Sequence, residues 1–224
     1  QQNKYEAALI QVKAIDKRNR EDGQRVMDLG QLALNNFKYD VAIDAFTYVK
    51  EKGPLNYNYM ISMSGLLLAL KAKITFSNYD QLAIERLLGE YKAALDQVGF
   101  RANSAMIMLD YAHVKAFFES KYSATALEEA TQILGKALEL PGLNENDAAR
   151  LKVELADIYV LSNEIWDASL LYGQVEKKFK YDEIGHSAKL KNALVFYYAG
   201  DFRWSQAQLN VLKGSTSKLI SNDA

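Results

Sequence analysis

Few side chains in this sequence could carry out acid–base or nucleophilic chemistry. His113 and His186 are the only imidazoles, and they lie far apart along the chain. A histidine base needs a reacting group within hydrogen-bond reach. His113 falls within a helical stretch, where we expect a packed or surface side chain, and His186 falls at a break, where we expect an exposed turn residue. No HExxH, GxSxG or GxxxxGK pattern occurs.

Two runs of like charge could also point to chemistry. Glu128 and Glu129 would fit acid–base work, but they open a predicted helix, where carboxylates favour the helix dipole. Lys177-Lys178-x-Lys180 would fit a phosphate or membrane contact, but the run ends a predicted helix, where cations favour the opposite pole. The absence of cysteine excludes disulfides, thiolate zinc sites and cysteine nucleophiles. We therefore expect no catalytic residues, no cofactor and no metal site.

The composition is that of an ordinary globular protein. Of the 224 residues, 49% are apolar and 25% are charged, and 27 basic against 28 acidic residues leave a net charge of -1. Neither side of Arg150 is basic enough to predict nucleic-acid binding. The longest uncharged stretch, 53–70, is interrupted by polar residues, and its apolar part, 60–70, is too short to cross a bilayer, so we predict a helix buried on most sides and no membrane span.

Apolar residues recur at helical spacing between breaks marked by glycine and proline, and no two-residue alternation predicts strands. The sequence therefore predicts an all-α fold. The expected helices are 4–18, 23–36, 39–51, 55–73, 79–97, 102–121, 124–139, 146–162, 165–179, 184–199 and 203–213.

Local signals mark several of these helix ends. Thr125-x-x-Glu128 is a capping-box pattern, Ser77-x-x-Asp80 is an acidic variant of it, and either Asn144 or Asn146 could cap the helix that follows. Five glycines fall inside predicted helices, each costing about 1 kcal/mol relative to alanine. We expect close approach between packed helices to offset that cost. These glycines are Gly30, Gly65, Gly89, Gly135 and Gly173.

Short connections between helices of this length are typical of an α-solenoid, which is built from sequence repeats. One segment contains Gly30, then Ala42, Phe46 and Val49 on a second helix, and Pro54 at its end. This segment resembles a tetratricopeptide repeat (TPR). In that family a small residue on the first helix lets the second approach, an alanine and an aromatic face it, and a proline closes the unit.

The same register recurs along the chain. Ala156 and Ala168 repeat the small-residue step from Gly30 to Ala42, as do Ala193 and Ser205. The resemblance implies a single domain over 1–224, a right-handed superhelix of stacked antiparallel helix pairs. Its expected units are a half repeat at 4–22, then 23–56, 57–98, 101–143, 146–183 and 184–219. The register within 57–122 stays unassigned. The ends of the sequence suggest a piece of a longer bacterial TPR protein.

In the resembled family the first helices line a concave groove that binds peptides or partner helices. The resemblance carries this role to positions on three first helices of this chain. They are Gln24, Met27, Gln31, Leu34 and Asn35; Arg150, Val153, Asp157, Val160 and Leu161; and Leu190, Leu194, Tyr197 and Tyr198. The Lys and Asn clamp by which some family members hold a chaperone's terminal carboxylate is absent from these positions.

Two readings stay open for the aromatic residues near the end of the chain. Tyr197 and Tyr198 could contact a partner or pack against a further repeat. For Trp166 and Trp204 we expect packing between repeats rather than ligand stacking.

The favoured function is a non-catalytic scaffold that binds a protein or peptide in the groove. The alternative is a helical-repeat receptor for a carbohydrate or other small ligand at the bacterial cell envelope. A helical-toroid enzyme is disfavoured, because the paired carboxylates it needs are not found. The periplasmic side of the envelope is slightly favoured over the cytoplasm, and the partner's identity and the oligomeric state stay open.

Overall fold

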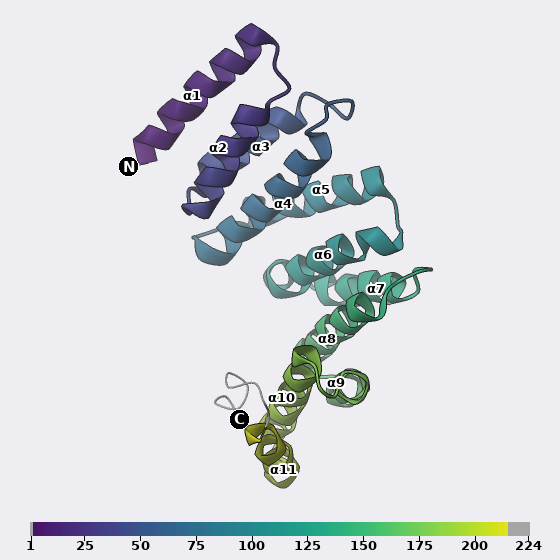
Figure 1. Ribbon diagram of the computed structural model, residues 1–224. Coiled ribbons are helices and arrows are strands. Elements are labelled where there is room, and N and C mark those ends of the chain that lie inside the picture. The colour runs from purple at the N-terminus through teal and green to yellow at the C-terminus, as the bar shows by residue number, and fades with distance from the viewer. Residues whose placement is uncertain (1, 215–224) are drawn as a thin grey trace. The chain divides into compact units, whose positions relative to one another are not determined.

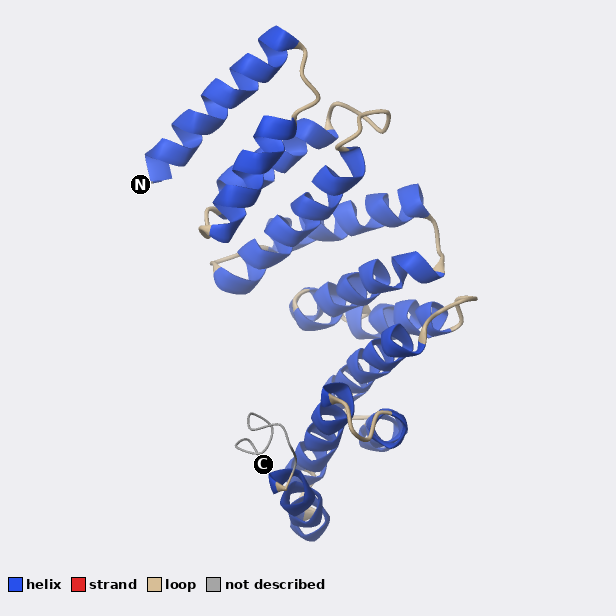
Figure 2. Cartoon of the chain, viewed as in Figure 1, coloured by secondary structure: helices blue, strands red, loops and turns tan. Residues whose placement is uncertain are grey.

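The structure is a computed structural model that describes residues 2–214, and all regular structure in that range is helical (Figures 1 and 2). The all-α fold is confirmed, and every expected helix is present with its ends within four residues of the predicted ones. The helices are α1 (Gln2–Asn19), α2 (Gln24–Asn35), α3 (Tyr39–Lys50), α4 (Tyr59–Phe76), α5 (Gln81–Val98), α6 (Ala105–Phe117), α7 (Ala126–Leu138), α8 (Glu145–Leu161), α9 (Ile165–Lys178), α10 (Glu183–Tyr198) and α11 (Phe202–Lys213). Short 3₁₀ turns flank α6 at Ala102–Ser104 and Glu119–Lys121.

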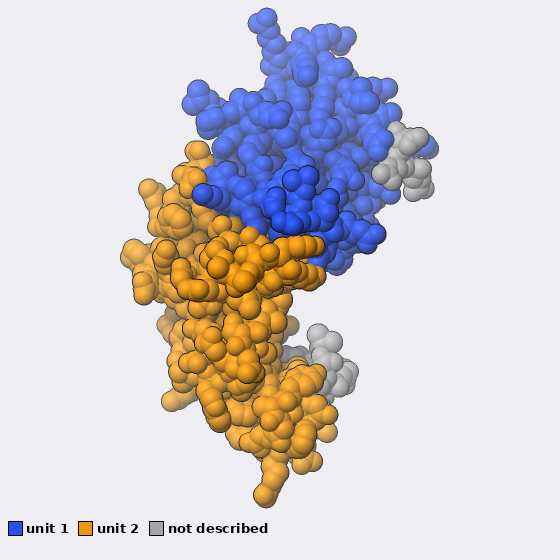
Figure 3. Space-filling view, turned by 180° about the vertical axis from the view of Figure 1, so that it is seen from behind, with its two compact units in different colours: residues 1–94 blue, residues 95–224 orange. Residues whose placement is uncertain are grey.

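The chain divides into two compact units, residues 1–94 and 95–224 (Figure 3). In the first, α2 packs on α3 and α3 on α4; in the second, each helix from α6 to α11 packs on the next. The first helices of successive pairs also touch, α2 with α4, α6 with α8, and α8 with α10. This pairwise stacking is the arrangement that α-solenoid repeats use to bury a face that one pair cannot cover alone. Residues 215–219 of the last expected unit lie outside the described residues.

Three helix pairs are joined by the same turn. Phe37, Asn163 and Gly200 each precede the second helix and adopt positive φ angles of 59°, 62° and 88°. In each turn the next residue's N–H donates to a carbonyl five residues earlier, at 2.8 Å in the first two and 2.9 Å in the third. This bond is the hallmark of the Schellman helix end, which requires a left-handed residue. The three pairs therefore share the geometry of their connecting turn.

Phe37 occupies a left-handed position that suits asparagine or glycine, and its side chain is 74% exposed. A bulky residue at positive φ is strained, whereas asparagine tolerates it. Replacing Phe37 with asparagine, the residue at the matching position 163, should therefore stabilise the protein by about 1 kcal/mol. Urea unfolding of the wild type and the variant measures the difference. A variant less stable than the wild type would contradict the strain.

Phe46 connects two first helices through their glycines. A Cβ added to Gly30 would lie 3.1 Å from the Phe46 ring, and one added to Gly65 would lie 2.8 Å from it. The ring itself is 1% exposed. Close helix approach thus offsets the helical cost of both glycines, as expected.

The same expectation is wrong for the other three glycines inside helices. A Cβ added to Gly89, Gly135 or Gly173 would meet no atom within 4 Å. Gly185, by contrast, lies in the first turn of α10, where an added Cβ would be 1.9 Å from the carbonyl oxygen of Phe179. Close packing between helices therefore explains Gly30, Gly65 and Gly185, but not the other three glycines inside helices.

The helix caps differ in detail from those predicted. Asn144 caps α8 by accepting from the Asp147 N–H at 2.8 Å, and Asp80 rather than Ser77 accepts from the Ala83 N–H at 2.9 Å. The Thr125 capping box is wrong, because the Thr125 hydroxyl donates to Glu129 at 2.8 Å instead. Glu129 also pairs with the buried Lys115 at 2.7 Å. It therefore joins α7 to α6 and does more than favour a helix dipole.

α4 is the one helix of the described residues that is long and apolar enough to cross a membrane by composition. It begins at Tyr59, later than expected, because Asn56 and Asn58 form the preceding turn. Only 39% of its 18 residues are buried, so the expectation of burial on most sides is wrong. The buried ones include Leu66, Leu70 and Ile74. Length and composition alone are weak evidence for a span, because a packed core helix has the same properties.

Candidate functional site

A pocket of about 420 Å³ opens on the face that α6, α8 and α10 form in residues 95–224. These three are the first helices of successive pairs, so the pocket lies where the expected groove would run in this unit. Its lining combines apolar and charged side chains. The lining residues are Met106, Leu109, Asp110, Arg150, Val153, Glu154 and Ile184.

The charged residues of this pocket are held differently. The Glu154 carboxylate lies at hydrogen-bond distance, 2.7 Å, from His113 Nδ1. The His113 ring stacks on the Phe117 ring, with their centroids 4.6 Å apart. His113 is thus a packed histidine that orients Glu154, in line with the expectation for it. Arg150 is exposed, and its guanidinium has no ion pair or side-chain hydrogen bond within residues 2–214. It is therefore available to an acidic group that enters the pocket.

The five predicted groove residues on α8 differ in their surroundings. Arg150 and Val153 line the pocket. Asp157 instead connects three helices, because it accepts from the Tyr172 hydroxyl at 2.5 Å and pairs with Lys191. Burial, and next to it the Asp157 charge, raise the pKa of Tyr172, so its hydroxyl stays a donor. Val160 is half-buried against the core around α9, and Leu161 is exposed at the helix end.

The five residues predicted on α2 differ in their exposure. Met27 and Leu34 are buried in the core of residues 1–94. Gln24, Gln31 and Asn35 are exposed and bond along their own helix, with Gln24 donating to Asp28 at 2.8 Å and Gln31 to Asn35 at 2.9 Å. Two of the five are thus core residues and three form an exposed polar surface.

The residues predicted on α10 lead into an aromatic cluster. Leu190 is half-buried, while Leu194 and Tyr197 are 37% and 48% exposed. The Tyr197 ring meets Tyr198 and Phe202 edge-on, with centroids 5.5 Å and 5.4 Å away. Tyr198 is 82% exposed, so the cluster presents aromatic surface.

The two tryptophans pack against the same phenylalanine. Phe196, which is buried, lies 4.3 Å from the Trp204 ring and 5.7 Å from the Trp166 ring between centroids. These contacts join α9, α10 and α11, as packing between repeats would. Trp166 remains 77% exposed on its other side.

Sequence reasoning missed five of the seven pocket residues. Met106, Leu109 and Asp110 lie on α6, within the stretch whose register could not be assigned. Glu154 follows a predicted groove residue, and Ile184 opens α10 ahead of the positions considered. Met108 and Ala112, two apolar residues four positions apart, are buried and set the inward face of α6. Their helical spacing is the sequence signal that could have placed the three pocket residues of this helix.

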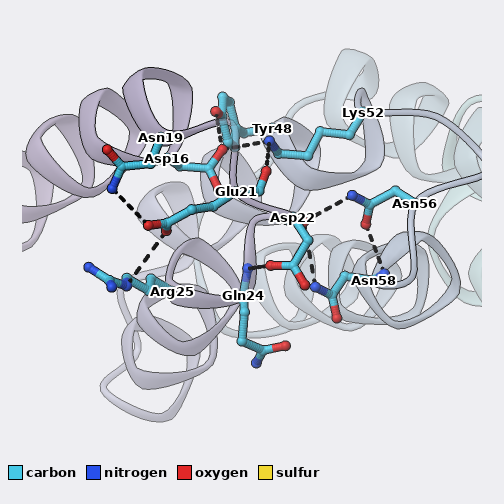
Figure 4. Close-up of polar contacts among 10 residues, drawn as sticks. All are labelled: Asp16, Asn19, Glu21, Asp22, Gln24, Arg25, Tyr48, Lys52, Asn56 and Asn58. Atoms are coloured by element: carbon cyan, nitrogen blue, oxygen red, sulfur yellow. Dashed lines mark hydrogen bonds and ion pairs between the residues drawn. The ribbon is translucent and has the colours of Figure 1, made fainter.

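Residues 1–94 contain a different polar cluster, which joins α1 to α3 (Figure 4). Asp16 is 1% exposed and accepts from the Tyr48 hydroxyl at 2.6 Å and from Lys52 at 2.5 Å. Next to it, the Asp22 carbonyl accepts from the Asn56 side chain at 3.0 Å. Burial alone would raise the pKa of Asp16, but the hydrogen bonds from Lys52 and Tyr48 outweigh it and hold the pKa below the ordinary value.

This lowered pKa predicts an acid-sensitive contact. Because the folded pKa of Asp16 lies below the unfolded one, the contact stabilises the fold above about pH 4 and is lost as the pH falls through the folded pKa. Asp16→Asn should remove about 1–3 kcal/mol at pH 7 and flatten the loss of stability between about pH 5 and 2. Urea unfolding across that range measures both. A variant with the wild-type pH dependence would exclude Asp16 as the source.

The sequence matches no protein-family model and no curated protein sequence. Two crystal structures of a Podosopora anserina chain, described as a kinesin light chain with nearly identical TPR-like repeats, share its fold. Both are 16% identical to it and cover 84% of this chain and 91% of their own, with TM-scores of 0.60 and 0.62. The second is a single-residue variant of the first.

The fold is a TPR-like α-solenoid. The tetratricopeptide resemblance of the sequence is thus confirmed at the level of the fold. Stacked repeats of this kind form extended concave surfaces.

Proposed function

We propose that this protein is a non-catalytic interaction scaffold that receives a peptide segment of a partner protein in the pocket on α6, α8 and α10. The observation that carries the proposal is the place of this pocket, on three successive first helices of a TPR-like unit. Arg150 and Val153, which the tetratricopeptide resemblance assigned to the groove, line it.

The lining indicates the chemistry of the peptide. Met106, Leu109, Val153 and Ile184 offer an apolar floor, and a methionine adapts to apolar side chains of different shapes. Arg150, an exposed lining residue, has its donors available for a carboxylate. The favoured ligand is therefore a peptide with an apolar side chain that enters the pocket and an acidic residue that reaches Arg150.

A peptide-library selection with the purified protein tests this proposal. Enriched peptides should combine apolar and acidic residues, and Arg150→Glu should weaken their binding about tenfold or more, because it replaces a charge-assisted bond by repulsion. Lys152→Glu is the matched control: it makes the same charge change on α8, but Lys152 contacts Gln174 instead of the pocket. Peptides that bind the wild type and Arg150→Glu equally would place the site elsewhere.

A second candidate function is binding of a carbohydrate or another small ligand, which the exposed aromatic cluster favours. Tyr197, Tyr198 and Phe202 present ring faces at the end of α10 and the start of α11. Aromatic rings with a polar tip suit ligands that have an apolar face and hydroxyl groups. Calorimetric titration with a panel of glycans tests this function. A flat response to the whole panel would reject it.

A further inference from the structure

A second and larger pocket, of about 740 Å³, lies within the α9–α11 region. The end of α9, the first turns of α10 and the end of α11 enclose it, and it shares no lining residue with the pocket on α6, α8 and α10. Side chains around it include Lys177, Lys180, Tyr181, His186, Lys189 and Leu212.

This pocket has an excess of positive charge. Among its lining residues Lys189 pairs with Glu176 at 2.8 Å, while Lys177 has no ion pair within the described residues. The ammonium of Lys180 lies 5.5 Å from the centre of the Tyr181 ring. The lysines of the run 177–180 therefore differ in role. Lys177 and Lys180 line the pocket, whereas Lys178 does not line it and pairs with Glu145 at 2.7 Å. Asp182, which precedes α10, and Glu183, which opens it, do not line the pocket.

Two glycines shape the cavity. The close approach of Gly185 to the Phe179 carbonyl brings the start of α10 onto the end of α9 and so fixes one side of the pocket. Gly173 lies inside α9 and lines the pocket, yet no atom lies within 4 Å of the place where its Cβ would be. A glycine there costs helix stability and improves no packing contact. Its effect is to leave the pocket open.

We propose that this pocket binds a small molecule that carries a phosphate group on an apolar or aromatic body. Lysine ammonium groups bind phosphate as point charges, and Lys177 and Lys180 are two such groups among the lining residues. Val211 and Leu212 form an apolar wall, and Tyr181 adds a ring. The volume falls within the range of about 300–1,000 Å³ found for small-molecule sites. This site is separate from the proposed peptide groove, so either proposal can fail alone.

The test is an NMR titration with phenyl phosphate, with phenol and inorganic phosphate as comparison probes. Phenyl phosphate should shift the signals of Gly173 and His186 and bind at least tenfold more tightly than either comparison probe. The double variant Lys177→Gln, Lys180→Gln should weaken binding at least tenfold. Lys178→Gln, a change within the same lysine run, should leave it unchanged. Equal binding by the double variant, or no response to phenyl phosphate, would overturn the proposal.

A second pair of variants tests the cavity without altering charge. Gly173→Ala should weaken phenyl phosphate binding severalfold, because the new methyl group enters the pocket. Gly135→Ala places the same methyl group in open space on α7 and should have no effect. Both changes favour the helix, so a loss of binding would not result from unfolding. Unchanged binding by Gly173→Ala would overturn the assignment of this pocket.

Discussion

Replacing Phe46 with alanine is expected to destabilise the protein by about 3–5 kcal/mol, the usual cost of removing a fully buried ring. The ring fills the space between Gly30 on α2 and Gly65 on α4, and it contacts both helices. Neither glycine has a side chain that could move into the cavity, so we expect the cost at the upper end of that range. The loss should appear as a lower urea midpoint for the unfolding of residues 1–94.

The matched control for this prediction is Phe37→Ala. It removes the same ring from a nearby position, but one that is 74% exposed and strained. The control should therefore unfold at the wild-type urea concentration or above it. Equal destabilisation by the two variants would contradict the role given to Phe46 in joining the two first helices.

Gly185→Ala is expected to destabilise the protein by about 3 kcal/mol or more, above the usual range for one added methyl group. The new Cβ would lie 1.9 Å from the Phe179 carbonyl oxygen and 2.6 Å from its carbon. Both are backbone atoms, so α10 must move away from the end of α9 rather than a side chain rotating. Thermal unfolding followed by circular dichroism measures the loss.

Gly135→Ala adds the same methyl group as Gly185→Ala but is expected to change the stability in the opposite direction. Its Cβ would meet no atom within 4 Å, and alanine favours a helix over glycine by about 1 kcal/mol. We therefore expect a small gain in stability. If Gly185→Ala were also neutral or stabilising, the close approach of α9 and α10 would be wrong.

The sequence was sufficient to predict the helices and most of their pairing. Helical spacing and the breaks between helices are local properties, and the small-residue step from Ala156 to Ala168 places both alanines in the buried interface. The cap of α8 was also predictable, because Asn144 bonds to a residue only three positions away. These features depend on neighbours in sequence.

Contacts between distant residues explain what could not be predicted. Gly185 falls in the first turn of the expected helix 184–199, and only the position of the Phe179 carbonyl at the end of α9 shows why glycine is needed there. Asp157 was assigned to the groove, yet Tyr172 and Lys191 engage it from two other helices.

The same limit applies to the candidate sites. Met27 and Leu34 matched groove positions but are buried, because a register position does not tell how deeply neighbouring helices cover it. The lysine run at the end of α9 has the same composition whether its side chains complement the helix dipole or surround a pocket. Which of these lysines faces the cavity depends on where α10 and α11 lie.

The central claim is that a partner protein binds in the pocket on α6, α8 and α10, and photo-crosslinking in the source cells tests it most directly. A photoreactive amino acid would replace Met106 or Ile184 in the pocket, and Gln132 on the second helix α7 as the control. We expect one partner protein to crosslink from both pocket positions and not from Gln132, and Arg150→Glu to abolish both crosslinks. Crosslinks from Gln132 alone, or none from either pocket position, would contradict the proposed function.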